Sequence, residues 1–190
     1  MTDEPEAILF YSRKAGYGWL SNFWRSPFVM RIDPFDSKED RGGVFAFPTN
    51  EHFYQSQKAT DTFTRRWIAS APTPFAAMLA GRSLRPHEFR QDWERVKVNV
   101  MLTGLRKKFT LGSDLGDLLL GTGDAKIHED SPTDEFWGWR GCERCGGPHK
   151  PGVVDAYMHF PAKPGYGKDM LGKCLMSVRA ELRTDLENQR

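Results

Sequence analysis

Cysteine, net charge and long apolar runs are all scarce in this sequence of 190 residues. The three cysteines are an odd number, which argues against a disulfide framework. A net charge of +2 is too weak to indicate nucleic-acid binding by itself. No apolar run approaches the roughly 20 residues that span a bilayer, so we expect no membrane-spanning helix. Residues 1–7 are acidic and have no apolar signal core, which predicts a flexible tail on a cytoplasmic protein.

The composition is that of a globular chain with a sizeable core. Hydrophobic residues make up 39% and charged residues 27%, and the length suits a single domain, expected over residues 8–190. Aromatic residues reach 13%, with six Trp and thirteen Phe, enough to line a ligand pocket as well as a core. We therefore expect one aromatic-rich domain, whose oligomeric state stays open.

The order of apolar and polar segments predicts a helix-rich α+β fold. Short apolar runs at residues 8–11, 28–32 and 44–47 predict strands, which we expect to form a small antiparallel sheet. Turn residues and helical periodicity predict a short extended segment at 125–129 and helices over 50–60, 63–70, 74–80, 87–109, 111–120 and 167–186. The predicted fold class is thus a single α+β domain whose sheet comes from the N-terminal strands.

The segment that begins the first predicted helix carries a carboxylate at a defined position. Pro48 disfavours a helical conformation in the residue before it, and Thr49 or Asn50 can cap the turn that follows. Glu51 then falls in the first turn, where the helix dipole favours a carboxylate by about 0.3–1 kcal/mol. This local preference explains Glu51 without any chemistry. The alternative is that Glu51, among the aromatic residues of the segment, faces a pocket where it activates water or stabilises a cation.

Three further residues, far apart in the sequence, are candidates for the same pocket: Trp93, Asp134 and Trp137. A tryptophan on an amphipathic helix more often belongs to the core, and an aspartate in a turn more often caps the local backbone. Sequence spacing does not show whether the three residues meet Glu51. The residues alone therefore leave both a pocket and a purely structural role open.

A series of separate motifs extends from about residue 8 to residue 182. In chain order they are Phe10-Tyr11, Gly18-x-Leu20-Ser21-Asn22-Phe23, Phe47-Pro48-Thr49-x-Glu51-His52-x-Tyr54-Gln55-x-Gln57-Lys58, Gly81-Arg82, Trp93, Val96-Lys97, Met101, Leu105-Arg106-x-Lys108-Phe109, Asp134-x-x-Trp137-Gly138 and Gly167-Lys168-x-x-Leu171-Gly172-x-x-Leu175-Met176-x-Val178-Arg179. Together they resemble the motifs of the NADAR family, also called YbiA-like. The number of motifs and their shared order make the resemblance specific.

The resemblance implies an N-glycosidase, which hydrolyses the bond between a ribose anomeric carbon and a nitrogen. Family substrates include ADP-ribose attached to guanine in nucleic acid, favoured here because aromatics and arginines suit a large nucleotide, and ribosylamino intermediates of the riboflavin pathway. The resemblance implies Glu51 as catalytic base or cation stabiliser and Asp134 as second catalytic carboxylate. It implies Trp93 and Trp137 as pocket walls, and the charges of Lys58, Arg82 and Arg85 suit a phosphate. The substrate-binding residues that we expect are Tyr11, Ser21, Asn22, Phe23, His52, Tyr54, Lys58, Arg82, Trp93, Trp137 and Gly138. No organic cofactor is expected.

The segment at about residues 139–165 holds two cysteines and is too long for a plain connection inside a domain. Cys142 and Cys145, followed by His149, have the spacing of a zinc knuckle. His128, His159 and Cys174 are alternatives for a fourth ligand. The other interpretation is a glycine-rich loop with two thiols. Typical members of the family that the chain resembles lack so long an insertion, so a zinc ion here would be structural.

Two features depart from the family pattern or have two interpretations. Asp169 follows Gly-Lys, where the family often has Asn, so any hydrogen bond that this Asn donates is in doubt. Basic residues form either a solvated helix face or a contact for phosphates and nucleic acid; they are Arg82, Arg85, Arg90, Lys97, Arg106, Lys107 and Lys108.

Two interpretations without catalysis also remain. The chain is compatible with a module that binds ADP-ribose or an NAD-like ligand without turnover. It is also compatible with a zinc-stabilised interaction domain that uses residues 139–165. Ligand binding without product release distinguishes the first from an enzyme, and loss of partner binding on deletion of the loop supports the second.

Overall fold

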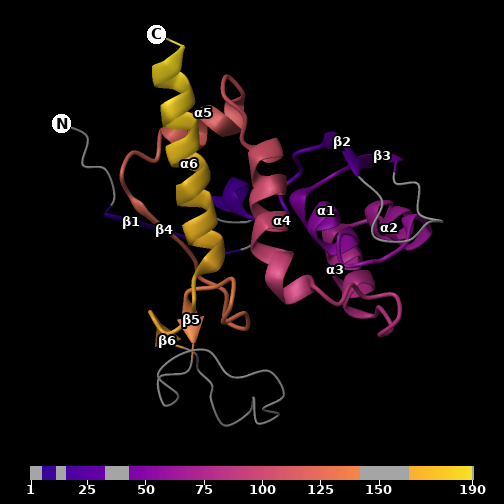
Figure 1. Ribbon diagram of the computed structural model, residues 1–190. Coiled ribbons are helices and arrows are strands. Elements are labelled where there is room, and N and C mark those ends of the chain that lie inside the picture. The colour runs from indigo at the N-terminus through magenta and orange to yellow at the C-terminus, as the bar shows by residue number, and fades with distance from the viewer. Residues whose placement is uncertain (1–5, 12–15, 33–42, 142–162, 190) are drawn as a thin grey trace. The chain divides into compact units, whose positions relative to one another are not determined.

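The computed structural model describes residues 6–11, 16–32, 43–141 and 163–189 (Figure 1). The chain forms two compact units. Residues 22–108 make one, here called the helical unit; residues 1–21 together with 109–190 make the other, here called the discontinuous unit. Helices dominate the described residues and their strands pair only in twos, which confirms the predicted helix-rich α+β class.

An antiparallel hairpin opens the helical unit. Its strands are β2, Phe28–Ile32, and β3, Gly43–Phe47. Successive residues of a strand point to opposite faces, so Phe45 and Phe47 are buried while Val44 is exposed. The buried face belongs to a core cluster formed by Ile32, Phe45, Phe47, Phe53 and Ala69. This hairpin is the predicted antiparallel pairing of N-terminal strands.

Four helices complete the helical unit. They are α1, Asn50–Ser56, α2, Thr62–Ala69, α3, Pro74–Arg82, and α4, Trp93–Lys108. Thr49, Asp61 and Thr73 each cap one of the first three helices, because each side chain accepts a hydrogen bond from the backbone amide three residues further on. These bonds satisfy amides that the first turn of a helix leaves without a partner.

The start of α4 differs from the prediction, which placed it near residue 87. The Arg90 amide donates to the oxygen of Lys58, and the Thr60 amide donates to the oxygen of Glu88, both at 2.9 Å. Residues 88–90 therefore pair with residues 58–60, and the backbone groups that make these bonds are not available for a helix. The helical interpretation of this stretch was wrong because tertiary pairing outweighs local propensity.

α1 is the central, buried helix of the helical unit. All seven of its residues are buried, and it packs against α2, α3, α4 and β3 (Figure 1). Two glycines allow this close approach. A Cβ atom at Gly81 of α3 would lie 2.2 Å from Gln55 Oε1, and one at Gly104 of α4 would lie 1.8 Å from Asn50 Oδ1. Any larger residue at either position would push α1 away from its neighbour.

A parallel strand pair lies in the discontinuous unit. β1, Ala7–Phe10, runs parallel to β4, Lys126–Glu129, with Ile8 opposite Ile127. β1 therefore does not join the hairpin, contrary to the expectation that all three N-terminal strands form one antiparallel sheet. Ile8, Phe10 and Ile127 are all buried, and β4 packs against α6. Pairing with β4 thus buries the apolar face of β1.

Two helices and a short strand pair make up the rest of the discontinuous unit. α5, Asp114–Leu120, packs against α6, Met170–Asn188. The apolar stripe predicted for the last helix is confirmed by the burial of Leu171, Leu175, Val178 and Leu182. β5, Arg140–Gly141, pairs antiparallel with β6, Lys163–Pro164, near the two ends of the predicted insertion. None of the helices in the described ranges is both long and apolar enough to cross a membrane.

Candidate active site

Glu51 lies in the first turn of α1, as the sequence predicts, and is only 6% exposed. Thr49 is the residue that caps this helix, because its hydroxyl oxygen accepts a hydrogen bond from the His52 amide. The Glu51 amide donates to the backbone oxygen of Asn22 at 3.0 Å. Gln55 Nε2 donates to Glu51 Oε1 at 2.7 Å. A nearly buried carboxylate is thus held through both its main chain and its side chain.

Tyr54 of α1 packs with a second aromatic ring and with an ammonium group. Tyr54 packs against Trp93 of α4 with ring centroids 5.0 Å apart and planes tilted by 58°. The ammonium of Lys58 lies 5.5 Å from the centroid of Tyr54 and 5.6 Å from that of Trp93. Tyr54 stands three residues after Glu51, a spacing that places both on one face of α1, whereas Lys58 lies two residues beyond the end of this helix. The structure therefore brings together three of the predicted site residues, Tyr54, Trp93 and Lys58, and Tyr54 belongs to the helix that carries Glu51.

His52, predicted to bind substrate, has both ring nitrogens engaged inside the helical unit. His52 Nδ1 lies 2.8 Å from Thr49 Oγ1, and His52 Nε2 lies 3.1 Å from the backbone oxygen of Ala71. Since the Ala71 oxygen only accepts, Nε2 carries the proton and Nδ1 accepts from the hydroxyl. Burial lowers the pKa of His52, although the bond to Ala71 opposes this. A neutral His52 thus anchors the start of α1, and a role in binding substrate stays a prediction.

Asn22 is similarly engaged within the helical unit. It is 8% exposed, and its Oδ1 accepts a hydrogen bond from Asn50 Nδ2 at 2.8 Å. Its backbone oxygen and its side chain therefore both fix the start of α1. Among the neighbouring predicted residues, Phe23 is half-buried and Ser21 is buried, whereas Tyr11 is 49% exposed.

Asp134 shapes a turn in the discontinuous unit. Its Oδ1 accepts hydrogen bonds from the amides of Phe136 at 3.0 Å and Trp137 at 2.8 Å. The same turn caps α6, because the amides of residues 168–171 donate to the backbone oxygens of residues 135–138 at 2.7–3.1 Å. A Cβ atom at Gly138 would lie 2.4 Å from the oxygen of Asp134, so the turn needs glycine there. These contacts give Asp134, Trp137 and Gly138 a structural role, and their catalytic and binding roles stay predictions.

A histidine and an aspartate that the prediction did not join form a second polar centre in the discontinuous unit. His128 Nδ1 lies 2.6 Å from Asp169 Oδ2, and the Glu129 amide donates to Asp169 Oδ1 at 3.3 Å. Trp139 stacks on His128 with centroids 4.5 Å apart. Burial raises the pKa of Asp169, against the opposing effect of His128. Asp169 thus acts here as an acceptor, and no local spacing links residues so far apart in the sequence.

Several residues of the predicted basic cluster are buried or form ion pairs with acidic residues. Lys108 is 4% exposed, and burial lowers its pKa far below the usual range. Three other members form ion pairs: Arg85 with Glu88 at 2.8 Å, Arg90 with Asp92 at 2.7 Å, and Lys97 with Glu94 at 2.5 Å. Arg82 is exposed at the end of α3. These pairs favour the solvated-face interpretation for much of the cluster.

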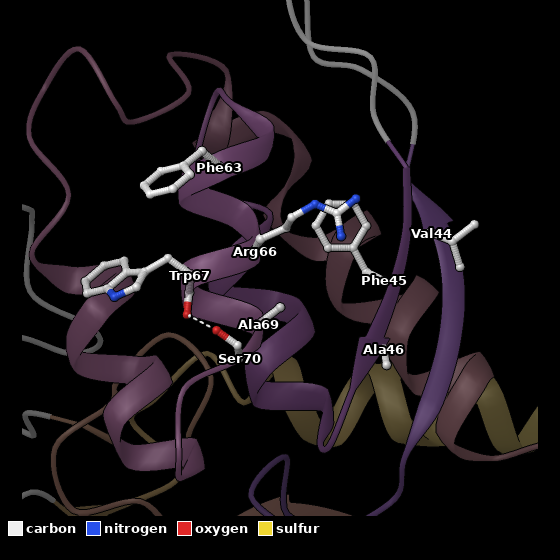
Figure 2. A pocket seen from close by; sticks show the side chains of 8 residues that line it. All are labelled: Val44, Phe45, Ala46, Phe63, Arg66, Trp67, Ala69 and Ser70. Carbon is white, nitrogen blue, oxygen red and sulfur yellow. Dashed lines mark hydrogen bonds between the residues drawn. The ribbon is translucent and has the colours of Figure 1, made fainter.

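A hollow of about 450 Å³ lies between α2 and β3, away from the predicted site residues (Figure 2). Figure 2 shows Phe63 and Trp67 pointing off one side of α2, where they are 83% and 54% exposed. Arg66 points instead towards β3, and its guanidinium lies 4.6 Å from the ring centroid of Phe45. None of the eight residues that line this hollow was predicted to bind substrate.

The predicted zinc ligands Cys142, Cys145 and His149 lie outside the described residues. Within the described ranges, no group of three or more His, Cys, Asp or Glu side chains is arranged to hold a metal ion. Cys174, one alternative for a fourth ligand, is 3% exposed in α6. His128, another alternative, is paired with Asp169. The zinc site therefore stays a prediction.

Fold and site together define a small helix-rich α+β protein with a buried carboxylate in the first turn of α1. The sequence profile of the NADAR domain family matches residues 9–183, and the chain belongs to this family. The resemblance to this family is thus confirmed.

Three relatives show the range of the similarity. An N-glycosidase of Nostoc punctiforme is 36% identical over 180 residues, which cover 93% of this chain and 92% of that protein. The N-glycosidase YbiA of Escherichia coli is 34% identical over 175 residues, covering 92% and 88%; its NMR structure matches with a TM-score of 0.66 at 32% identity, over 95% of this chain and 87% of that one. A riboflavin biosynthesis protein of Vibrio vulnificus is 29% identical over 178 residues, which are 94% of this chain but 39% of that protein. The first two place this chain among hydrolases of glycosidic bonds.

Proposed function

We propose that this chain hydrolyses the bond between a ribose anomeric carbon and a nitrogen, in a substrate where ADP-ribose is attached to guanine in nucleic acid. The observation that carries the proposal is the buried carboxylate of Glu51, which Gln55 holds in the first turn of α1, the helix whose Tyr54 contacts Lys58. Relatives named N-glycosidase support the type of reaction. The choice of substrate rests on the family resemblance and on a site rich in aromatics and cations.

Glu51 and Lys58 suit the cleavage of an N-glycosidic bond. Cleavage of an N-glycosidic bond builds positive charge on the ribose ring, as in other glycoside hydrolyses. An ionised Glu51 either stabilises that charge or takes a proton from the attacking water. The water oxygen bonds to the anomeric carbon, the carbon–nitrogen bond breaks, and the base leaves with the electron pair and takes up a proton. Lys58 supplies a positive charge for a phosphate or sugar oxygen of the substrate.

Ribosylamino intermediates of the riboflavin pathway are the alternative substrates. The relative named as a riboflavin biosynthesis protein favours them. The bond broken and the role of Glu51 would be unchanged, and only the leaving group would differ. A third candidate is a module that binds ADP-ribose or an NAD-like ligand and does not turn it over.

Incubation of the full chain with each substrate class tests the proposal. One sample receives an oligonucleotide carrying ADP-ribosylated guanine, the other a ribosylaminopyrimidine phosphate, and chromatography measures the free base and free sugar. Release from the oligonucleotide, absent with Glu51→Gln, supports the proposal. Release from the pyrimidine alone selects the alternative, and binding without release selects the module. Equal release by the wild type and Glu51→Gln removes Glu51 from the mechanism.

A further inference from the structure

Two buried amide side chains of α1 share an arrangement that simple packing does not explain. In each of Asn50 and Gln55, the side-chain oxygen is buried and has no hydrogen-bond partner among the described residues, while the nitrogen donates. Each oxygen presses against a glycine, Gly104 for Asn50 and Gly81 for Gln55. A buried polar group without a partner costs about 1–3 kcal/mol, which an apolar side chain of similar size would avoid. The arrangement therefore indicates that the two nitrogens have a role.

One nitrogen contacts Glu51 directly, and the other contacts a residue that holds the Glu51 main chain. Gln55 Nε2 donates to Glu51 Oε1 at 2.7 Å. Asn50 Nδ2 donates to Asn22 Oδ1 at 2.8 Å, and the backbone oxygen of the same Asn22 accepts from the Glu51 amide at 3.0 Å. One amide thus holds the carboxylate, and the other holds the segment that fixes the main chain of the same residue.

We propose that Gln55 is a positioning residue for Glu51, which directs one N–H onto the carboxylate, fixes its orientation and keeps it ionised. The catalytic part of this inference rests on the proposed function, since it assumes that Glu51 acts on substrate. A hydrogen bond donated to an ionised carboxylate favours the charged form over the protonated form. Both roles considered for Glu51, as base and as cation stabiliser, need that charge.

Gly81 leaves room for the Gln55 side chain, and Glu51 sets the orientation of its amide. A Cβ atom at position 81 would lie 2.2 Å from Gln55 Oε1 and 3.0 Å from Gln55 Cβ, so only glycine leaves room for this side chain. Reversing the amide would set its oxygen against the Glu51 carboxylate, where two acceptors repel each other. The orientation with nitrogen towards Glu51 is therefore the favourable one, and the oxygen is left against Gly81 as a consequence.

The test compares Gln55→Met with a matched control, Gln57→Met. Methionine removes the donor with little change in volume. Gln57 is also buried, directly follows α1, and donates to Ser56 Oγ at 3.2 Å rather than to Glu51. The readouts are the pH dependence of kcat/KM and a carbon-13 NMR titration of the glutamate carboxyls, with Glu51→Gln used to assign the signal of Glu51.

We expect Gln55→Met to raise the acid-side midpoint of the pH profile and the Glu51 titration midpoint together, by about one pH unit. Gln57→Met should leave both midpoints unchanged. A second variant, Gln55→Glu, keeps the side-chain shape and places a second carboxylate beside Glu51, so it should raise the midpoint further. Gln55→Glu also replaces Gln55→Met in the test if the methionine variant does not fold.

Two failures can be told apart. Equal Glu51 titration midpoints in the wild type and the position-55 variants overturn the role of Gln55, even if the enzyme is active. A wild-type protein that cleaves neither substrate overturns the proposed function, while the NMR titration still decides whether Gln55 keeps Glu51 ionised.

Discussion

Asp169 and His128 form a close pair, with Oδ2 and Nδ1 2.6 Å apart, at the junction of β4 and α6. Asp169 adopts a left-handed backbone conformation with φ of 52°, which aspartate and asparagine tolerate better than most residues. It also accepts from the Glu129 amide, and Trp139 stacks on the imidazole. The residue that departs from the expected family asparagine therefore has its own structural role.

Replacing Asp169 with asparagine should change how stability depends on pH. Burial raises the pKa of Asp169, so the folded protein binds this proton more tightly than the unfolded chain. The carboxyl therefore favours folding at acidic pH, and this contribution is lost as the pH rises through the raised pKa. We expect Asp169→Asn to be more stable than the wild type at neutral pH, because Asn stays neutral, keeps an acceptor for the Glu129 amide and offers a donor to His128.

Urea unfolding across acidic and neutral pH measures this difference. The advantage of the variant should shrink as the pH falls, because the wild-type carboxyl becomes protonated. A difference in unfolding free energy that stays constant over the whole range would contradict the prediction.

Replacing Glu51 with glutamine should separate catalysis from folding. Glutamine has nearly the same shape and keeps an oxygen that can accept from Gln55. We expect a thermal midpoint close to that of the wild type and a loss of turnover of about 10²- to 10⁴-fold, the usual contribution of a general base. Circular dichroism melting and product release measure the two quantities. A near-normal rate with an intact fold would argue that another group carries the reaction.

Trp93 provides a test of core against pocket wall. It is 5% exposed and contacts Tyr54 and Phe89, with the Phe89 centroid 6.2 Å away. We expect Trp93→Ala to lower the free energy of unfolding by about 3–5 kcal/mol, as for other large buried side chains. Trp93→Phe, which keeps a ring against Tyr54, should cost less. If chemical denaturation shows Trp93→Ala as stable as the wild type and only KM rises, Trp93 is a pocket wall rather than core.

The packing of α1 against α4 should be disturbed by a single methyl group added at Gly104. A Cβ atom at Gly104 would lie 1.8 Å from Asn50 Oδ1 and 2.7 Å from the Phe53 ring. We expect Gly104→Ala to lower the free energy of unfolding by about 1–3 kcal/mol through overpacking. The neighbouring Thr103 is exposed, so Thr103→Ala is the control and should change it by no more than about 0.5 kcal/mol. Equal urea midpoints for the two variants would show that α1 tolerates a wider gap.

Local patterns predicted much of the helical unit. The hairpin strands match within one residue, and the first three helices begin where a threonine or aspartate caps them. These features depend on neighbours in the sequence: alternation along a strand, and a side chain within reach of an amide three residues away. The position of Glu51 in a first turn follows from the same local rules.

Predictions that depended on distant residues did less well. The pairing of β1 with β4 joins segments more than 100 residues apart, as the register of Ile8 with Ile127 shows, and no period in the sequence encodes it. The late start of α4 follows from pairing with residues 58–60. In the basic cluster, Lys108 is buried and three other members form ion pairs with acidic residues, which the sequence did not indicate.

The amino-acid order alone therefore specified the α+β class and the helix turn that carries Glu51, because short-range sterics and hydrogen bonding set these, and its motifs identified the family. Packing of α1 against α3 and α4 determined the surroundings of that carboxylate. Gln55 stands four residues from Glu51, a spacing visible in the sequence, but only the packing of α3 shows that Gly81 leaves room for its side chain. Burial turns such contacts into constraints, since a buried polar atom has no water to replace its partner.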